Sequence, residues 1–259
     1  MQRTCNFRAI LRVSVALSLA LEIIFSLGCS TAHHREEANL RLQLGTSMLE
    51  AGNLPGALRE LLKAEAEDPN NEVIQNNIGL VYFLRDRNDI AIQHLRRALE
   101  IKPLYSDARN NYGRLLIETA QYDRGISEIE HVLTDLTYDQ PQKAYLNLGL
   151  GYFRKGDYLL AKTQLTEALK IDRRNCLAQI LYGRAVLELG ELEIATHTLD
   201  NSVILCKDSK ADEARYYSGL SYYKLGQPSP AIARMEEVVR LYPEGAYAKK
   251  AQSLLKLMK

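Results

Sequence analysis

The sequence lacks a charge excess of either sign. Its 33 lysines and arginines stand against 32 aspartates and glutamates, which gives a formal net charge of +1. Proteins that bind nucleic acid usually carry a clear basic excess, so we expect no nucleic-acid partner. The sequence also lacks H-x-x-x-H, C-x-x-C, G-x-S-x-G and phosphate-loop patterns. We therefore expect no enzymatic activity, no cofactor and no small-molecule substrate.

Long apolar runs are absent after residue 28, so no later segment is long enough to span a membrane. The one apolar run, Val13 to Leu21, follows the basic residues Arg3, Arg8 and Arg12. A short apolar core after positive charges, with a small residue before the cut, is typical of a secretion signal. Residues 1–28 are therefore predicted to be a signal peptide.

The pair Gly28-Cys29 at the end of this run resembles a bacterial lipoprotein signal. The resemblance implies that Cys29 receives lipid and becomes the mature N-terminus, and that residues 29–37 form a linker. Ser30 after the cysteine resembles the outer-membrane class, which implies a lipid-anchored protein on the periplasmic face of the outer membrane. An ordinary cleaved signal or an uncleaved anchor stays open, because Glu22 places a costly carboxylate inside the apolar core.

A 34-residue self-similarity covers residues 38–245. A period of this length indicates a stack of small repeated units. Six copies are predicted, at residues 38–71, 72–105, 106–139, 142–175, 176–209 and 212–245. Glycine recurs at position 8 as Gly45, Gly79, Gly113, Gly149, Gly183 and Gly219. A large apolar residue recurs at position 24 as Leu61, Leu95, Ile129, Leu165, Leu199 and Met235.

These positions resemble the tetratricopeptide repeat, which has small residues at positions 8, 20 and 27. The third copy departs from that pattern, with Gly125 in place of alanine at position 20 and Thr137 in place of proline at position 32. The resemblance implies an all-α fold, a right-handed superhelix of six helix-turn-helix repeats. Residues 246–259 are predicted to form a C-terminal capping helix, with Ala248, Ala251, Leu254, Leu255 and Met258 on one side.

The functional surface implied by the resemblance is a groove lined by the first helices of the repeats. It corresponds to positions 2, 5, 9, 12 and 13 of each copy. The predicted partner-binding residues are Asn76, Leu80, Phe83, Asn110, Arg114, Ile117, Leu146, Leu150, Phe153, Arg154, Ile180, Arg184, Leu187, Tyr216, Leu220 and Tyr223. Aromatic residues with arginines nearby are typical of interface hot spots, so this groove is expected to bind a protein segment. Packing of some of these residues against a neighbouring repeat or the cap is the alternative.

Four cysteines are present, and two of them lie in the repeats. Cys176 and Cys206 occupy positions 1 and 31 of the fifth copy, which lie close together in an antiparallel helix pair. An exported protein meets an oxidising compartment, so a Cys176–Cys206 disulfide is the hypothesis and two free thiols are the alternative. The repeat histidines, His94, His131 and His197, come from three different copies and are expected to be surface residues rather than metal ligands.

Six such repeats behind a lipoprotein signal resemble the type IV pilus pilotins of the PilF/PilW/Tgl family. The resemblance implies a non-enzymatic factor that binds outer-membrane secretin subunits and assists their assembly and localisation. A general periplasmic scaffold lipoprotein is the second hypothesis; it would serve β-barrel assembly, cell-wall synthesis or polysaccharide export.

Overall fold

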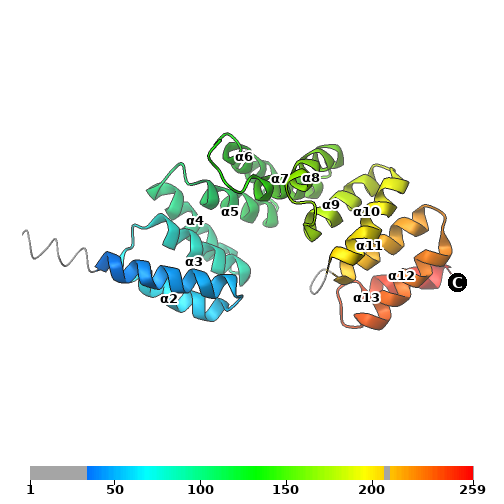
Figure 1. Cartoon of the computed structure of the whole chain (residues 1–259), viewed down its shortest axis with the longest axis horizontal. Helices are drawn as coiled ribbons and strands as arrows, with labels where there is room; N and C mark the ends of the chain where they lie inside the picture. The colour runs from blue at the N-terminus through cyan, green and yellow to red at the C-terminus, as the bar shows by residue number, and fades with distance from the viewer. Residues whose placement is uncertain (1–33, 207–210, 259) are drawn as a thin grey trace, which may run out of the picture. The chain divides into compact units, whose positions relative to one another are not determined.

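The computed structural model describes residues 34–206 and 211–258. The predicted signal peptide and Cys29 lie outside these residues. All regular structure in the described part of the chain is helical (Figure 1). A first helix covers residues 34–50, and the others are α2 (Leu54–Glu67), α3 (Glu72–Leu84), α4 (Asn88–Ile101), α5 (Ser106–Glu118), α6 (Tyr122–Val132), α7 (Pro141–Lys155), α8 (Tyr158–Ile171), α9 (Cys176–Glu188), α10 (Leu192–Leu205), α11 (Ala211–Lys224), α12 (Pro228–Leu241) and α13 (Ala248–Met258).

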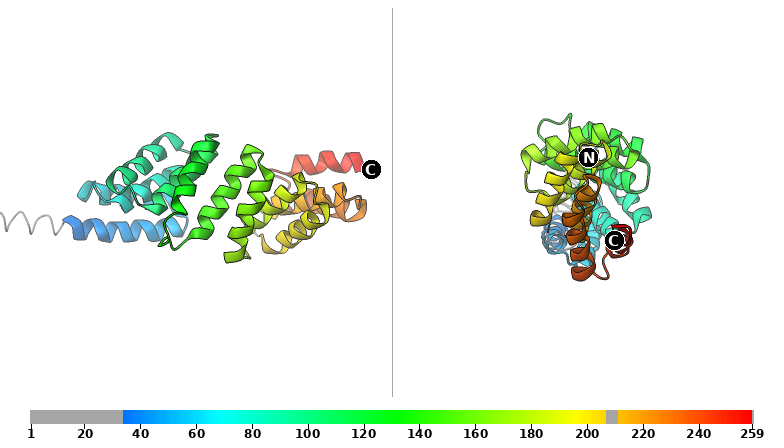
Figure 2. Two further views of the ribbon diagram at one scale, coloured as in Figure 1. Left: turned by 90° about the horizontal axis from the view of Figure 1, so that it is seen from above. Right: turned by 90° about the vertical axis from the view of Figure 1, so that its right-hand side faces the viewer.

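The helices fall into two compact units, one up to Tyr105 and one from Ser106 onward, called unit 1 and unit 2 below. Within each unit, consecutive helices pack side by side as helix-turn-helix pairs (Figure 2). In unit 2 the first helices of successive repeats also contact one another, α5 with α7, α7 with α9, and α9 with α11. The predicted all-α repeat fold is confirmed.

The helix starts earlier than the sequence suggested. The sequence predicts a linker over residues 29–37, but residues 34–37 belong to the first helix. His34 hydrogen-bonds to Glu67 at the end of α2, and Glu37 pairs with Arg41 one turn later. These polar contacts to the repeat favour helix over linker at this point.

The two helices of each repeat approach closely because glycine at position 8 faces the large apolar residue at position 24. A Cβ atom on Gly79 would lie 2.8 Å from Cγ of Leu95, nearer than real side chains come. Leu95 is fully buried by this packing. The same relationship recurs in all six repeats, in the pairs Gly45–Leu61, Gly79–Leu95, Gly113–Ile129, Gly149–Leu165, Gly183–Leu199 and Gly219–Met235.

The turn inside each repeat uses a left-handed backbone conformation at position 15. Four repeats have glycine there, for which positive φ is unstrained: Gly52 (φ 75°), Gly156 (φ 92°), Gly190 (φ 79°) and Gly226 (φ 76°). The second and third repeats hold the same conformation with Asp86 (φ 57°) and Ala120 (φ 62°). The turn geometry is therefore retained even where the residue opposes it.

Close packing explains why the third repeat has glycine in place of alanine at position 20. A Cβ atom on Gly125 would lie 2.6 Å from the carbonyl oxygen of Gly113 and 2.7 Å from Cγ1 of Ile117. Ile117 is fully buried and also lies over Gly151 of α7, where an added Cβ would meet its Cδ1 at 2.8 Å. The isoleucine therefore fills space that two glycines leave open.

The C-terminal helix α13 covers the apolar side of the last repeat. Ala251 and Leu254 of α13 form one buried cluster with Met235 and Val238 of α12. Exposed residues on α13 are mostly polar: Lys249, Lys250, Gln252, Ser253 and Lys256. This arrangement matches what a terminal helix of a repeat stack needs.

Candidate protein-binding site on the first helices

The predicted groove residues differ in how much of each side chain is accessible. Arg154 and Tyr223 are exposed. Half-buried are Leu80, Phe83, Arg114, Leu146, Phe153, Arg184, Tyr216 and Leu220. Buried are Asn76, Asn110, Ile117, Leu150, Ile180 and Leu187.

Packing between helices accounts for the buried members of this set. Leu187 belongs to a buried cluster with Ala195 and Leu199 of α10. Ile180 packs with Cys206 and with Ala214 of the next repeat. For these side chains the structure shows core packing, which is the alternative left open for the groove.

In unit 2, the surface formed by α5, α7, α9 and α11 is called the first-helix face. Its α5–α7 end is polar. Nδ2 of Asn147 donates a hydrogen bond to Oδ1 of Asn110 at 3.1 Å, and both amides are buried. Burial raises the pKa of the Asp107 carboxyl, and the nearby ammonium group of Lys143 partly opposes this rise.

An ion-pair cluster extends this polar end. Nη2 of Arg154 lies 2.5 Å from Oε2 of Glu118, which joins α7 to α5. Nη2 of Arg114 lies 3.7 Å from the other oxygen of the same carboxylate. Burial lowers the pKa of Arg114, and the Arg154 cation lowers it further while Glu118 opposes both effects. Two guanidinium groups therefore share one carboxylate.

Arg184 of α9 contacts several side chains at the other end of the first-helix face. Its guanidinium carbon lies 4.5 Å from the ring centroid of Phe153 on α7 and 4.3 Å from that of Tyr217 on α11. Its Nη1 donates a 2.9 Å hydrogen bond to Oε1 of Glu213, which is buried. Cation–π contacts and a charge-assisted hydrogen bond thus link three successive repeats.

Tyrosine rings continue this cluster toward α13. Tyr216 lies 5.0 Å and Tyr217 5.6 Å, centroid to centroid, from the ring of Tyr247. Burial raises the pKa of the Tyr247 hydroxyl, and the charge of Glu213 raises it further. Tyr216 and Leu220 also pack against the cluster that α12 forms with α13. The aromatic end is therefore closed by the segment that follows the last repeat.

The sequence interpretation missed Glu213, Tyr217 and Tyr247. Tyr217 and Tyr247 lie outside the repeat positions assigned to the groove. Glu213 lies at position 2 of its repeat, which is a groove position, but it is not among the predicted partner-binding residues. The signal that could have found them is the tyrosine density of the sixth repeat, where Tyr216 and Tyr217 are adjacent. Tyrosines at such density often pack on one another or on an arginine.

Unit 1 carries a smaller polar ladder on its first helices. Nδ2 of Asn76 donates to Oδ1 of Asn77 at 3.0 Å, and Nδ2 of Asn77 donates to Oγ1 of Thr46 at 2.9 Å. Leu80 and Phe83 on the same helix α3 are half-buried. These contacts hold α3 against the first helix.

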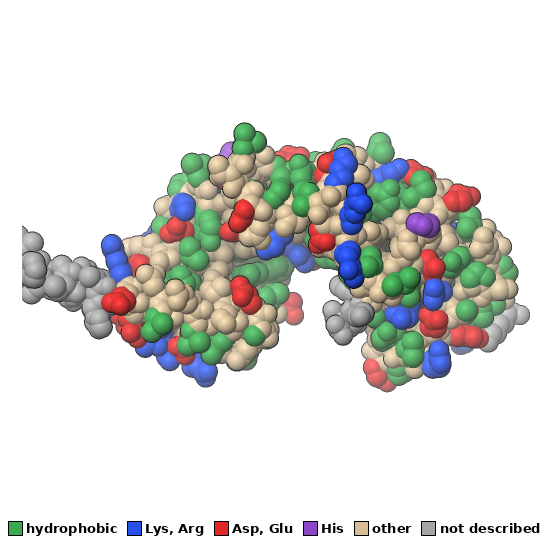
Figure 3. Space-filling model, viewed as in Figure 1, with side chains coloured by type: hydrophobic (Ala, Val, Ile, Leu, Met, Phe, Trp, Pro, Cys, Tyr) green, Lys and Arg blue, Asp and Glu red, His purple; other side chains and the backbone are tan. Residues whose placement is uncertain are grey.

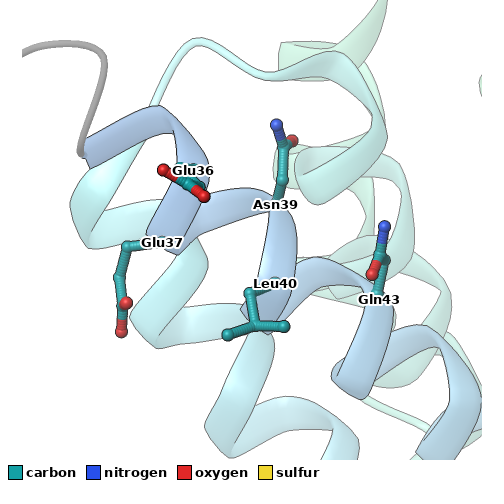
Figure 4. A pocket seen from close by; sticks show the side chains of 5 residues that line it. All are labelled: Glu36, Glu37, Asn39, Leu40 and Gln43. Atoms are coloured by element: carbon teal, nitrogen blue, oxygen red, sulfur yellow. The ribbon is translucent and has the colours of Figure 1, made fainter.

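Hollows lie beside the helices of unit 1. One, of about 410 Å³, runs beside the first helix, where Asn39 and Gln43 lie one turn apart on the same side (Figure 4). It is lined by Glu36, Glu37, Asn39, Leu40 and Gln43. The other, of about 340 Å³, includes His94, whose Nδ1 lies 2.8 Å from Oε1 of Gln75.

His94 is held as a structural residue. Nε2 of Gln75 donates to Oε1 of Glu65 at 2.8 Å, so its carbonyl oxygen faces His94 and accepts from the ring. The ring also stacks on Tyr82, with centroids 5.7 Å apart. Burial lowers the pKa of His94, and Glu65 opposes this. Across residues 34–206 and 211–258 no group of three histidines, cysteines or carboxylates could hold a metal ion.

Cys176 and Cys206 are joined in a disulfide, with Cα atoms 5.1 Å apart. The bond links the first residue of α9 to the residue that follows α10. It therefore closes the fifth repeat on itself.

No helix within the described residues has the length and apolar character needed to cross a membrane.

Charged side chains of both signs are spread over the side seen in Figure 3, and several basic side chains form a short row near the middle of the view. On the side seen in Figure 3, acidic and basic side chains are interspersed with hydrophobic ones. This agrees with the near-neutral composition.

Family models for the tetratricopeptide repeat match residues 42–106, 142–175 and 213–245, together just over half of the chain. With the helix pairs described above, these matches show that the chain belongs to the tetratricopeptide repeat proteins. Proteins of this kind bind protein partners on the surface of their stacked repeats.

Several known proteins are similar to this chain in sequence. DnaJ homolog subfamily C member 3 of Gallus gallus is 25% identical over 79% of this chain, which spans only 43% of that relative. Type IV pilus assembly protein PilF of Pseudomonas aeruginosa is 26% identical over 54% of this chain and 56% of its own length. Putative cellulose synthase operon protein C of Escherichia coli O157:H7 is 27% identical over 78% of this chain and 16% of its own.

Two solved structures of type IV pilus proteins share the fold. The crystal structure of PilW, a type IV pilus biogenesis factor, aligns with a TM-score of 0.75 at 23% identity, covering 84% of this chain and 98% of PilW. A solved structure of PilF from Pseudomonas aeruginosa aligns with a TM-score of 0.72 at 20% identity, covering 85% of this chain and 99% of PilF. The resemblance to type IV pilus biogenesis proteins seen in the sequence is confirmed at the level of fold.

Proposed function

We propose that this chain is an outer-membrane lipoprotein that binds type IV pilus secretin subunits and assists their assembly and localisation. The observation that carries the proposal is the extent of the match to PilW and PilF, which spans 98% and 99% of those chains. The DnaJ and cellulose synthase relatives are much longer than the region they share with this chain. The pilus proteins are therefore the better guide to its role.

The disulfide supports the exported location in this proposal. Disulfides persist in secreted and periplasmic proteins and are rare in a reducing cytosol. In the proposal, lipid on Cys29 anchors the chain at the periplasmic face, and the first helices bind the partner. The protein acts by binding, without catalysis.

The test is the heat-resistant secretin multimer in membranes of the source organism. Three strains are compared: wild type, a deletion of this gene, and a strain carrying Cys29→Ala. The proposal predicts that multimers disappear in the deletion strain and are mislocalised with Cys29→Ala. Normal multimers and normal surface pili in all strains would contradict it.

A general envelope scaffold is the second candidate. The match to cellulose synthase operon protein C over 78% of this chain favours it. It predicts that the deletion leaves secretin multimers intact and that site-specific crosslinking from the first helices captures a different envelope protein.

A further inference from the structure

The contact between the fifth and sixth repeats is made of small side chains. A first helix packs against the preceding repeat through positions 3, 7 and 10. In the second repeat these positions hold large aliphatic side chains, all fully buried against α2: Ile74, Ile78 and Val81. In the sixth repeat they hold small side chains, also fully buried: Ala214, Ser218 and Ser221. Because apolar stabilisation scales with the area buried, α11 is held less firmly by this packing than α3 is.

The buried serine hydroxyl groups do little to join α10 to α11. Oγ of Ser202 donates to the carbonyl oxygen of Leu199 in its own helix α10 at 2.6 Å, and Oγ of Ser221 donates to that of Ser218 in α11 at 2.7 Å. Oγ of Ser218 reaches across the contact and donates to Oδ1 of Asp200 at 3.1 Å. Two of these three hydroxyl bonds therefore lie within one helix.

Apolar packing at the C-terminal end of α10 comes from the cluster that contains the disulfide. Val203 and Cys206 pack there with Ile180 of α9 and Ala214 of α11, and Cys176 lies against them. The bond between Cys176 and Cys206 ties this end of α10 to the start of α9. The disulfide therefore fixes the surface on which Ala214 packs.

The first-helix side of the same contact is held by Arg184. Its Nη1 donates to Oε1 of Glu213 at 2.9 Å, and its guanidinium carbon lies 4.3 Å from the ring centroid of Tyr217. Both partners lie on α11. The fifth and sixth repeats are thus joined by an arginine on one side and by the disulfide cluster on the other.

The helices before α10 have stronger apolar packing of their own. One buried cluster includes Ile117, Ile129, Leu148 and Leu165, and it extends to α9 through Leu181. This cluster contains neither cysteine. Helices α5–α9 are therefore expected to stay folded when the disulfide is broken.

We propose that the Cys176–Cys206 disulfide is a redox latch on the sixth repeat: when it is reduced, α10 and the helices that follow it open locally, while the earlier repeats stay folded. The inference goes beyond the proposed function and does not depend on it. Because Glu213 and Tyr217 lie on α11, opening also removes the partners of Arg184. The redox state of the compartment then decides whether the aromatic end of the first-helix face is complete.

The step that releases the latch is thiol–disulfide exchange with a dithiol reductant. A thiolate of the reductant attacks Sγ of Cys176, because Cys176 is half-buried whereas Cys206 is 2% exposed. The electron pair of the broken S–S bond leaves with Cys206, which takes up a proton. The second thiol of the reductant then displaces Cys176 as a thiol. The products are two cysteine thiols and the reductant in its disulfide form.

The test is hydrogen–deuterium exchange, measured by mass spectrometry on the full chain purified in detergent. Wild type is compared before and after treatment with dithiothreitol, and with the variant Cys176→Ala/Cys206→Ala. Ala161→Gly is the matched control, because it weakens the packing of α8 in the fourth repeat and leaves the disulfide in place. Circular dichroism and alkylation confirm that each sample is folded and report its number of free thiols.

A further variant, Ser202→Ala/Ser221→Ala, tests the role of the weak contact. Alanine has nearly the same volume as serine, and the printed hydroxyl bonds of both residues lie within their own helices. The exchange makes the contact more apolar and favours helix in α10 and α11. It should therefore reduce the effect of breaking the disulfide.

Reduction is expected to speed amide exchange in α10 and α11 by at least about tenfold and to leave α3, α4, α7 and α8 within about twofold. Cys176→Ala/Cys206→Ala should show the same pattern and should not respond to dithiothreitol. Ala161→Gly should speed exchange in α7 and α8 instead. In Ser202→Ala/Ser221→Ala the response to reduction should shrink about threefold.

Three results overturn the inference: no change in α10 and α11 on reduction, an equal change in all helices, or a response that Ser202→Ala/Ser221→Ala leaves the same or enlarges. The outcome is separate from the secretin assay, because exchange is measured on the isolated chain. A working latch in a strain with normal secretin multimers after deletion keeps this inference and removes the proposed function. The reverse pair of results keeps the proposed function and removes the latch.

Discussion

The carbonyl oxygen of Gly113 lies 2.6 Å from the point where a Cβ atom on Gly125 would stand. This contact leads to a prediction that opposes the repeat pattern. Gly125→Ala restores the usual residue at position 20 and adds a better helix former, yet we expect it to destabilise the protein by about 1–3 kcal/mol through overpacking. Thermal or urea unfolding measures the change.

A matched control for this prediction is Ala161→Gly, the reverse exchange at the same position of the fourth repeat. Ala161 is fully buried in α8. Its replacement is expected to cost about 1 kcal/mol through lost helix propensity. Stabilisation by Gly125→Ala would show that α5 and α6 lie farther apart than described.

The strained turn of the third repeat predicts a stabilising substitution. Ala120 has φ 62°, where an L side chain costs about 1–2 kcal/mol and glycine costs nothing. Ala120→Gly should therefore raise the free energy of unfolding by about 1 kcal/mol, after the greater flexibility of glycine in the unfolded chain is subtracted. Gly190→Ala, at the same position of the fifth repeat, should lower it. Equal effects of the two substitutions in one direction would count against this account.

The disulfide predicts sensitivity to reduction. Cys176 and Cys206 are 30 residues apart in sequence, and closing a loop of this length is worth about 3–4 kcal/mol. Cys176→Ser or added reductant should lower the midpoint of unfolding, and reductant should have no further effect on the variant. Alkylation without reductant should leave the mass of these two cysteines unchanged. Two alkylated thiols under those conditions would exclude the bond.

His94 predicts a pH dependence of stability. Its pKa in the folded protein is lowered below 6.5, chiefly by burial, so the unfolded chain takes up the proton first as the pH falls. Its contribution to stability is present above pH 6.5 and is lost as the pH falls below that value. His94→Gln should therefore flatten the fall in melting temperature between pH 7 and pH 5. His131→Gln, which removes an exposed histidine, should leave the slope unchanged.

The Arg184–Glu213 pair predicts a partial rescue. Glu213→Gln weakens the hydrogen bond to a cation held between two rings, so it should cost about 1–3 kcal/mol. Adding Arg184→Met removes the uncompensated charge and should recover part of that loss. Urea unfolding of the single and double variants measures how much stability is recovered. An additive loss would mean that the two groups act independently.

Much of the fold was predictable because the same residue types recur at the same positions of each repeat. Gly79 and Leu95 stand sixteen residues apart in the sequence and in contact in the structure, and the same pair recurs six times. Cys176 and Cys206 could be matched because an antiparallel helix pair brings the two ends of a repeat together. The helical conformation of residues 34–37 was not predictable, since it depends on contacts such as His34 with Glu67.

The sequence predicted which side of the helices forms the candidate site, but not which side chains are accessible there. Repeat positions place Ile117, Leu187 and Phe153 on the same side of their helices, but the first two are buried and the third is half-buried. The difference depends on what the neighbouring helix offers: glycine at residues 125 and 151 admits Ile117. Register along one helix does not contain that information.

The Arg184 cluster also has a mechanical consequence. Phe153, Arg184, Tyr217 and Tyr247 come from four successive segments, and each touches the next. A stack tied in this way resists bending, because any change of angle between the helices must separate an arginine from a ring. Between α5 and α7 the ties are the Asn110–Asn147 hydrogen bond and the shared Glu118, which can reform after small shifts. Unit 2 should therefore resist bending between α7, α9 and α11, and should bend more easily between α5 and α7.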